Sequence, residues 1–448
     1  MPDWEDMRGF LDYLEKRGEL IRIKKEVDTI FEVAAYIRKS SDVGGPAFLF
    51  ERVKDFPDWR AVGALYATHG RVALALGTSP EKALARFQEA IENPIEPVLI
   101  TSAPCQEVVI EGDEVDLFKL PIVKHSEKDA GRYITSAVQI AKDPETGVKG
   151  LGMHRMLVKG KDRLGLWAPG ERRIGRAFLK CEERGRPLDI AICNGLDPLV
   201  VLGSVARVPH DVEKLSIAGG LRGEPVKLVP CKTIDLEVPA HAEVVIEGEV
   251  LPGVREREAP FGEFTGCHSY EREAPVVRVR AITMRREPIW QTVLTGMPVT
   301  EDHILNWLAV CQVIYQCASY ACPEVRGVNV FGNYVYEAVV SIKKRMEGEP
   351  YNVIASVLGG PAQAKYCIVV DEDINVFDWR DVEWALCTRV QPHRDVHIFP
   401  VMLGAPLDPS APIPRHTSKL GIDATIPLDA DRARFERCRV PGAEEVSW

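Results

Sequence analysis

Two glutamates, Glu258 and Glu263, lie close together in the segment 249–268. Pro260 and Gly262 stand between them and interrupt any regular helix or strand, so both acids are predicted to lie on one bent loop. A neighbouring carboxylate or burial can raise the pKa of one acid towards neutrality, which suits general acid–base catalysis. Taken alone, the same residues also fit a solvated acidic turn, because short motifs recur by chance.

A second informative segment is Gly150-Leu-Gly-Met-His-Arg155, which enters a predicted strand after a turn. Arginine is the residue that most often holds a carboxylate in two-point geometry. If Arg155 paired with Glu258, it would fix that acid and leave Glu263 to exchange a proton with a substrate. Sequence spacing does not bring these three residues together, so the hypothesis depends on the fold.

The composition excludes several classes of protein. The chain has 448 residues, 46% of them hydrophobic and 27% charged, which is typical of a globular protein with two or three domains. The net charge of −10 argues against a nucleic-acid-binding surface, and no apolar run is long enough for a membrane span. The acidic N-terminus is unlike a secretory signal, and eleven cysteines without CxxC pairs indicate reduced thiols. We therefore expect a cytoplasmic protein.

The predicted elements change in kind along the chain. Residues 1–104 alternate short strands and amphipathic helices, which indicates an N-terminal α/β domain. Residues 105–300 contain many short strands, interrupted by helical patterns at 171–184 and 197–218, which favours a split β-barrel whose mouth could hold a cofactor. Residues 301–405 return to an α/β alternation. The Pro-rich residues 406–448 are predicted to form an extended tail that contacts another domain or subunit.

Six segments, taken together and in order, resemble the UbiD-type decarboxylases, which use prenylated FMN. They are GRYIT (131–135), GLGMHRM (150–156), CKTIDLEVPAHAEVVIEGE (231–249), EAPFGEFTG (258–266), KYCIVVDEDINVFDWRDVEWAL (365–386) and SKLGIDAT (418–425). The resemblance runs nearly end to end. It implies a multidomain α+β and α/β protein, with an N-terminal α/β domain, a central split-barrel flavin domain and a C-terminal α/β oligomerisation domain. It also implies a homodimer or hexamer.

The resemblance implies a reversible, non-oxidative decarboxylase of an aromatic, heteroaromatic or α,β-unsaturated acid. In the family, CO2 leaves an acid bound to the modified flavin, and a carboxylic acid then protonates the product. Carried over, Arg155 and Glu258 orient the reacting groups and Glu263 donates the proton. The expected partners are the acid, CO2 and a flavin prenyltransferase that supplies the cofactor. A physiological carboxylase and a non-catalytic, cofactor-carrying subunit of a carboxylase complex are the alternatives.

Further site residues are implied by the resemblance and fall into two groups. The cofactor-binding group is Met153, His154, Arg155, Trp167, Ala168, Pro169, Arg172, Arg173 and Lys227. The substrate-lining group is Met297, Pro298, His303 and Ile304. His303 either binds a polar group of the substrate or covers the start of the helix predicted from Glu301.

The family holds the flavin phosphate through a divalent metal such as manganese, with potassium nearby and Asn, His and Glu as ligands. Ungapped counting places Gly150 at the Asn position, Arg172 or Arg173 at the His position, and Lys227 at the Glu position. One lysine carries the same +1 charge as a carboxylate plus a divalent ion. We therefore expect Lys227 and an arginine to hold the phosphate without metal. The alternatives are another acidic ligand, Glu224 or Glu171, and a site that has lost the flavin.

Overall fold

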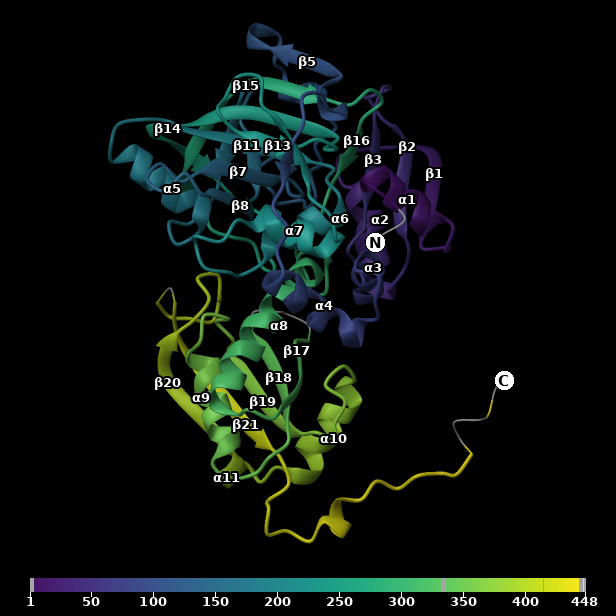
Figure 1. Cartoon of the computed structure of the whole chain (residues 1–448), viewed down its shortest axis with the longest axis vertical. Coiled ribbons are helices and arrows are strands. Elements are labelled where there is room, and N and C mark those ends of the chain that lie inside the picture. The colour runs from purple at the N-terminus through teal and green to yellow at the C-terminus, as the bar shows by residue number, and fades with distance from the viewer. Residues whose placement is uncertain (1–3, 332–335, 414, 443–445, 447–448) are drawn as a thin grey trace. The chain divides into compact units, whose positions relative to one another are not determined.

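The computed structural model describes residues 4–331, 336–413, 415–442 and 446. The chain divides into two compact units, Met1–Ala309 and Val310–Trp448, coloured from purple to green and from green to yellow (Figure 1). The predicted mixture of helices and strands is confirmed throughout. Among the described residues, no helix combines the length and the apolar character needed to cross a membrane.

The first unit begins with a four-stranded sheet in the order β1-β2-β3-β16. Its strands are β1 (Leu20–Val27), β2 (Ala47–Val53), β3 (Arg60–Gly63) and β16 (Ile289–Gln291). The accompanying helices are α1 (Met7–Glu15), α2 (Glu32–Val43), α3 (His69–Ala75) and α4 (Pro80–Glu92). Strand β16 comes from the end of the strand-rich segment and pairs in parallel with β3. The N-terminal sheet is therefore completed by residues far along the chain.

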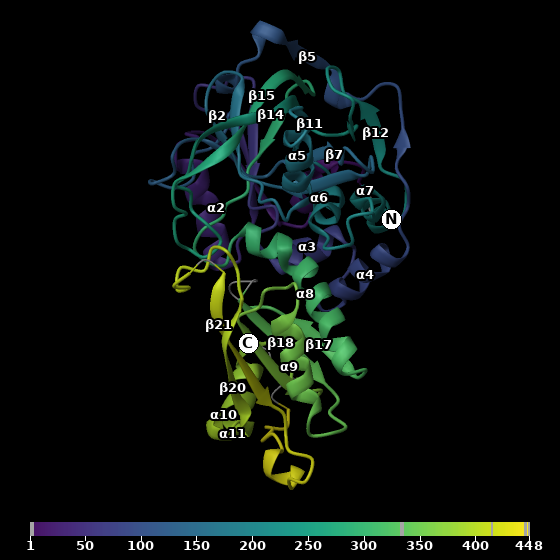
Figure 2. The same cartoon turned by 90° about the vertical axis from the view of Figure 1, so that its left-hand side faces the viewer.

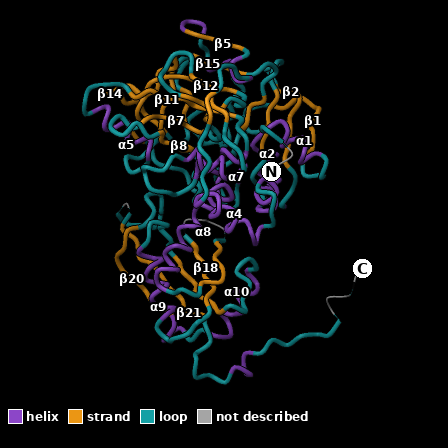
Figure 3. The backbone as a smooth tube through the Cα atoms, in the orientation of Figure 1, coloured by secondary structure: helices purple, strands orange, loops and turns teal. Residues whose placement is uncertain are grey.

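A nine-stranded sheet forms the centre of the first unit, in the order β6-β9-β10-β15-β14-β11-β7-β8, with β5 paired to β15. Its strands are β5 (Val108–Glu111), β6 (Tyr133–Ile134), β7 (Val138–Lys142), β8 (Lys149–Met153), β9 (Met156–Val158), β10 (Arg163–Leu166), β11 (Leu188–Asn194), β14 (Val244–Glu258) and β15 (Arg272–Met284). The long antiparallel pair β14–β15 curls across the unit, and its strands are orange in Figure 3. The strand-rich character is confirmed, while the split-barrel form stays a prediction.

Three helices accompany the central sheet: α5 (Arg173–Glu182), α6 (Pro198–Val205) and α7 (Lys214–Arg222). All three contact strand β8. Figure 2 shows these helices near β7, the strand that pairs with β8. The sequence predicts one helix over 197–218, whereas the structure has α6 and then α7, which extends beyond that range to Arg222. Pro209 lies in the loop that separates them, and proline has no N–H for a helical hydrogen bond. The break creates a loop beside the first turn of α5, because Arg173 bonds to its carbonyls.

A small sheet in the order β13-β12-β4 lies apart from the large one. Its strands are β4 (Val98–Leu99), β12 (Lys227–Pro230) and β13 (Glu237–Pro239). Short 3-10 turns flank these segments at η1 (Pro104–Gln106), η2 (Gly112–Glu114) and η3 (Leu117–Lys119). Strand β12 pairs in parallel with β4, which links residues that follow α4 to residues that follow α7.

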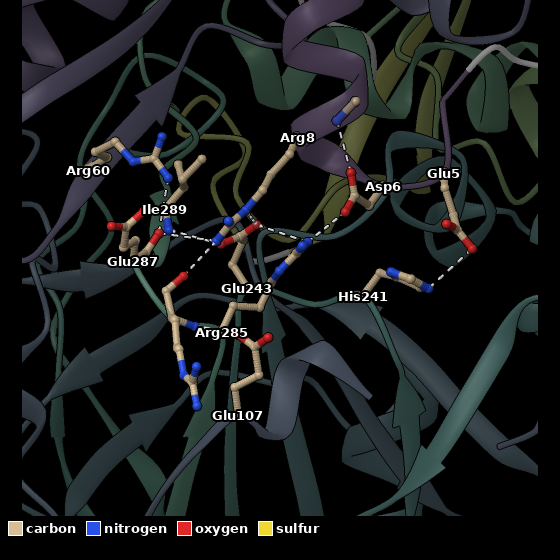
Figure 4. A network of polar contacts seen from close by, with 12 residues as sticks. Glu5, Asp6, Arg8, Arg60, Glu107, His241, Glu243, Arg285, Glu287 and Ile289 are labelled. Atoms are coloured by element: carbon tan, nitrogen blue, oxygen red, sulfur yellow. Dashed lines mark hydrogen bonds and ion pairs between the residues drawn. The ribbon is translucent and has the colours of Figure 1, made fainter. Parts of the chain in front are cut away.

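A polar network fastens helix α1 to the central sheet (Figure 4). The fully buried carboxylate of Glu243 accepts two hydrogen bonds from Arg8, each of 2.7 Å, and one from the main-chain N–H of Ile289 at 3.0 Å. Arg285 donates to Asp6 at 2.6 Å, and Asp6 caps α1 by accepting from the N–H of Gly9. A buried charge is tolerated only when it is paired in this way.

Helix α8 (Glu301–Ala321) leads into the second unit, which contains a five-stranded sheet in the order β17-β18-β19-β21-β20. The strands are β17 (Val325–Asn329), β18 (Glu337–Ile342), β19 (Tyr366–Asp371), β20 (Val396–Leu403) and β21 (His416–Ala424). The helices are α9 (Glu349–Gly359), α10 (Trp379–Arg389), α11 (Pro392–Asp395) and the 3-10 turn η4 (Arg432–Phe435).

Residues 406–448 contribute more to the second unit than the extended tail predicted for them. Strand β21 lies inside the sheet, parallel to β19 and antiparallel to β20. Its alternating buried side chains pack in the unit's own interior. Further along, Arg437 forms an ion pair of 2.6 Å with Asp381 of α10. Strand β21 and Arg437 therefore belong to the second unit, while the described residues after η4 run on as an extended segment (Figure 1).

Candidate active site

The structure brings Arg155, Glu258 and Glu263 into direct contact. Arg155 holds Glu258 through two hydrogen bonds, Nε to Oε1 at 2.8 Å and Nη2 to Oε2 at 3.1 Å. Its third nitrogen, Nη1, donates to Oε1 of Glu263. Glu258 is completely buried and Glu263 is 7% exposed. One guanidinium thus connects two acids that differ in their access to the surface.

The loop between the two acids is shaped by its own sequence. Glu258 is the last residue of β14, and Ala259 takes a positive φ of 76° before Pro260 turns the chain. A tight turn then follows Glu263, because the N–H of Gly266 donates to the carbonyl of Glu263 at 2.9 Å. Gly266 itself has a φ of 80°, a conformation that glycine adopts without a steric penalty. The predicted bend is present, but Glu258 ends strand β14 and does not lie on the loop predicted for both acids.

Aromatic side chains support the arginine. The guanidinium of Arg155 lies 4.9 Å from the ring centroid of Phe261, which in turn packs 4.6 Å from the ring of Tyr133. Burial lowers the pKa of Arg155, but its hydrogen bond with Glu258 and the charges of both acids outweigh this effect and leave that pKa raised. Arg155 is a permanently charged group in this site.

Asp129 anchors the loop from the opposite side and was missed by sequence reasoning. Its carboxylate accepts one hydrogen bond from the N–H of Gly262 at 3.0 Å and another from the N–H of Ser126 at 2.8 Å. The N–H of Ala130 also donates to the carbonyl of Pro260 at 2.9 Å. Asp129 is 3% exposed. No sequence signal links this residue to a turn more than a hundred positions away.

We expect Asp129→Ala to loosen the bend that carries Glu258 and Glu263. The substitution leaves the N–H groups of Gly262 and Ser126 without their acceptor, a loss that costs about 1–3 kcal/mol per buried group. Urea unfolding should show this loss, and turnover should fall while KM changes little. Lys128→Ala, at the exposed neighbouring position, is the matched control. Wild-type stability and turnover in Asp129→Ala would contradict the assigned contact.

Arg272 is a second cation near the site that sequence reasoning missed. It lies directly across the strand pair from Glu258, and its guanidinium stacks 4.0 Å from the ring centroid of Trp167. Burial and then the charge of Arg155 lower its pKa, while both site acids act on it as opposite charges. Arg155 and Arg272 thus place two positive charges beside Glu258 and Glu263.

Most of the residues proposed to bind a cofactor lie at the end of β8 or in the loop between β10 and α5. Met153 ends β8, and the main chain of His154 is gripped by Gln139, with bonds of 2.7 and 2.9 Å. The N–H of Trp167 donates to the carbonyl of Arg155 at 3.4 Å. The carbonyls of Ala168 and Pro169 lie close against Gly175 of α5. A Cβ at position 175 would stand 2.5 Å from the carbonyl oxygen of Ala168 and 2.2 Å from that of Pro169. Sequence neighbours of Arg155 are thus brought into one region.

The proposed metal positions are only partly brought together. Gly150 lies against Arg173, since a Cβ on Gly150 would stand 3.1 Å from the Cβ of Arg173. Lys227 lies elsewhere, on β12, and its ammonium pairs with Glu5 at 2.5 Å beside His241, which Figure 4 shows next to Glu5. Glu224 pairs with Arg222 at 2.9 Å. Among the described residues, no group of three His, Cys, Asp or Glu side chains could hold a metal ion.

Lys214, the first residue of α7, takes the place beside Gly150 and Arg173 that ungapped counting gave to Lys227. Its Nζ donates to the carbonyl of Leu151 at 3.2 Å and to that of Ser204 at 2.5 Å. One sequence signal could have drawn attention to Lys214. It is a charged residue at the start of a helix whose next seven residues, Leu-Ser-Ile-Ala-Gly-Gly-Leu, are small or apolar. Counting back from Cys231 without a gap selects Lys227, which pairs with Glu5 on β12, whereas Lys214 is the lysine that bonds to Leu151 of β8.

The proposed substrate-lining residues lie on both sides of the start of α8. Met297 is 64% exposed and packs against Gly266, together with Pro298. Ile304 is buried. His303 is also buried, with its Nδ1 3.0 Å from the N–H of Thr300 and its Nε2 2.7 Å from the carbonyl of Phe264. Both ring nitrogens thus bond to the main chain, which favours the interpretation that His303 covers the helix start.

Asp302 adds an acid that sequence reasoning did not assign. Burial, and after it the charge of Glu263, raise the pKa of Asp302 to about 6. Asn306, one helical turn further, donates to its Oδ1 at 3.2 Å. The neighbouring Glu301 is buried with a pKa raised to about 7, and it accepts from the N–H groups of Tyr66 and Leu294. The helix start therefore places further carboxyl groups beside the Glu263 loop.

Comparison with known families gives three matches in chain order. The 3-octaprenyl-4-hydroxybenzoate carboxy-lyase (UbiD) N-terminal domain matches residues 11–91, its Rift-related domain matches residues 98–298, and its C-terminal domain matches residues 303–424. The three matches together cover most of the chain.

Several characterised relatives resemble this chain over nearly their whole length. An anhydromevalonate phosphate decarboxylase of Methanothermobacter thermautotrophicus is 36% identical, covering 96% of this chain and 99% of the relative. A phenolic acid decarboxylase of Escherichia coli O157:H7 is 33% identical, covering 99% and 97%. The structure of the UbiD-class enzyme HmfF from Pelotomaculum thermopropionicum in complex with FMN has a TM-score of 0.94 at 40% identity, with 99% of each chain covered.

Proposed function

This chain belongs to the UbiD family of carboxy-lyases, and from that premise we propose that it decarboxylates an aromatic, heteroaromatic or α,β-unsaturated acid with prenylated FMN. The observation that carries the proposal is the sharing of Arg155 between two buried acids, Glu258 and Glu263. A family fold alone would not support a reaction, because function resides in the site.

The residues of the site divide the work between orientation and proton transfer. Glu258 holds Arg155 in a fixed plane through two hydrogen bonds, so the guanidinium has a defined direction for a substrate carboxylate. When the C–C bond breaks, CO2 leaves and the product carbon must receive a proton. Glu263 accepts a hydrogen bond from Arg155, so it would first take up a proton from solvent as it releases Arg155 and would then donate that proton to the product carbon.

The basic residues of this region suit the phosphate of prenylated FMN. When bound, it supplies the electron sink that the departing carboxylate requires. Met153, His154, Trp167, Ala168 and Pro169 would line it, and the basic residues near the starts of α5 and α7 would receive its phosphate. Lys214 bonds to the carbonyl of Leu151, which stands four positions before Arg155. Four residues of extended chain span about 13 Å. The proposed phosphate site is therefore separated from the reacting groups near Arg155.

The test is to produce the protein together with a flavin prenyltransferase and to record its absorbance spectrum. Purified protein is then given a panel of acids, including phenolic, furan and α,β-unsaturated examples, and CO2 release is measured. Exchange of labelled CO2 into each acid reports the reverse direction in the same sample. We expect CO2 release from at least one class, dependent on the modified flavin. A flavin-loaded protein that neither releases nor exchanges CO2 with any class would contradict the proposal and favour a cofactor-carrying subunit.

A further inference from the structure

Lys214 is a buried cation whose hydrogen bonds in the described structure go to main-chain carbonyls. It is 8% exposed, and its Nζ donates to Leu151 and Ser204. Burial of an ammonium group is costly unless an opposite charge is close by. Neither of these two hydrogen bonds supplies such a charge, since a carbonyl contributes only a dipole. A bound anion would supply the negative charge that the two carbonyls do not give to Lys214.

Three arginines lie near enough to act on Lys214, and their positive charges make its buried charge still less favourable. Burial and then the charges of Arg173, Arg172 and Arg207 lower the pKa of Lys214 to about 7. Arg173 is itself directed into the same region, because its guanidinium donates to the carbonyls of Val212 at 2.7 Å and Val208 at 3.1 Å. Like charges gathered in a partly buried region repel one another, so the cluster is most stable with a multivalent anion bound.

The main chain around the cluster is also suited to an anion. Helices α5 and α7 both begin here, and neither has an acidic residue in its first turn or a side-chain cap, although the N-cap residue of α7 is Glu213. The free N–H groups and the positive dipole end of each helix favour negative charge. The ring of His154 lies against Gly152, and a Cβ at position 152 would stand 2.8 Å from Nε2 of His154. Burial and then the charges of Arg172 and Lys214 lower the pKa of His154 to about 3, so it is neutral.

We propose that this cluster, Lys214 with Arg172, Arg173 and Arg207, binds the phosphate of the flavin cofactor directly and without a divalent metal ion. The inference rests on the proposed function, because it presumes a flavin with its ring near Arg155. It replaces Lys227, which pairs with Glu5 on β12, as the lysine of the phosphate site. A divalent cation placed beside Lys214 would add to the repulsion, and the described residues offer no group of acidic, His or Cys side chains to offset it.

The experiment measures FMN and riboflavin binding to chelator-treated apoprotein by quenching of flavin fluorescence. The two ligands share the ring and differ in the phosphate, so their ratio of affinities isolates phosphate binding. We expect wild-type protein to bind FMN more tightly than riboflavin, with equal FMN affinity in EDTA and in added MnCl2. Elemental analysis of the FMN-bound protein by mass spectrometry should find no stoichiometric divalent metal.

Lys214→Met tests the lysine itself. Methionine fills the same space and removes a buried charge, so the fold is not expected to suffer. Losing one charged contact should weaken FMN about 10- to 100-fold and leave riboflavin unchanged. Lys227→Met removes an exposed lysine of the same chain and should change neither affinity.

Each other outcome has a distinct meaning. FMN binding that is lost in EDTA and restored by manganese would overturn the inference and leave the proposed function standing. Equal FMN affinity in Lys214→Met and wild type would also overturn it. Binding of neither flavin by folded wild-type protein would overturn the proposed function, and the inference with it.

Discussion

Glu263→Gln is expected to reduce decarboxylation by about 10²–10⁴-fold and to leave the flavin content unchanged. The amide keeps the size of the side chain and can still accept a hydrogen bond from Arg155. It cannot supply the proton that the product carbon needs, so only the chemical step is removed. The measurement is single-turnover CO2 release by protein whose cofactor occupancy has been determined from its absorbance.

The control for this substitution is Glu271→Gln, which changes an exposed acid a few residues further along the chain. It should have nearly wild-type turnover. A labelled-solvent experiment sharpens the test, because Glu263→Gln should also lose the exchange of deuterium from water into the product. Near-normal turnover in a fully loaded Glu263→Gln protein would refute the role proposed for this acid.

Arg155→Ala is expected to damage turnover, cofactor retention and stability together. The change leaves Glu258 fully buried without its ion pair and places it near Glu263 without the charge that separates them. Removing one partner of a buried pair costs about 3–5 kcal/mol, which is a large fraction of the stability of a domain. Thermal unfolding of the apoprotein, flavin content after purification and turnover are the three measurements.

Two variants separate charge from geometry at this position. Arg155→Lys keeps the positive charge but loses the planar fork, so stability should partly recover while turnover stays low. Arg257→Ala removes an exposed arginine that pairs with Glu271 and should leave all three measurements near wild type. Wild-type kcat and KM in Arg155→Ala would show that the three-residue network does not perform the reaction.

The sequence by itself determined the chemistry-bearing loop. Pro260 and Gly262 exclude regular structure between Glu258 and Glu263, and the observed bend follows from these residue types. The strand-rich central segment and the α/β elements on either side were also predictable, because short-range patterns of apolar and turn residues encode them. The six family-like segments gave the order of the three matched domains.

The tertiary structure alone decided which distant residues meet. Asp129 reaches Gly262, β16 completes a sheet begun at Leu20, and β21 enters a sheet from a segment that resembles a tail. Such contacts depend on how whole elements pack against one another. The local pattern of apolar and turn residues predicts each element but does not say which distant element it will contact. The same holds for Lys214 and Lys227, two lysines on neighbouring elements of one chain. Ungapped counting cannot tell them apart, because a loop of altered length shifts every later position, whereas burial against β8 distinguishes them at once.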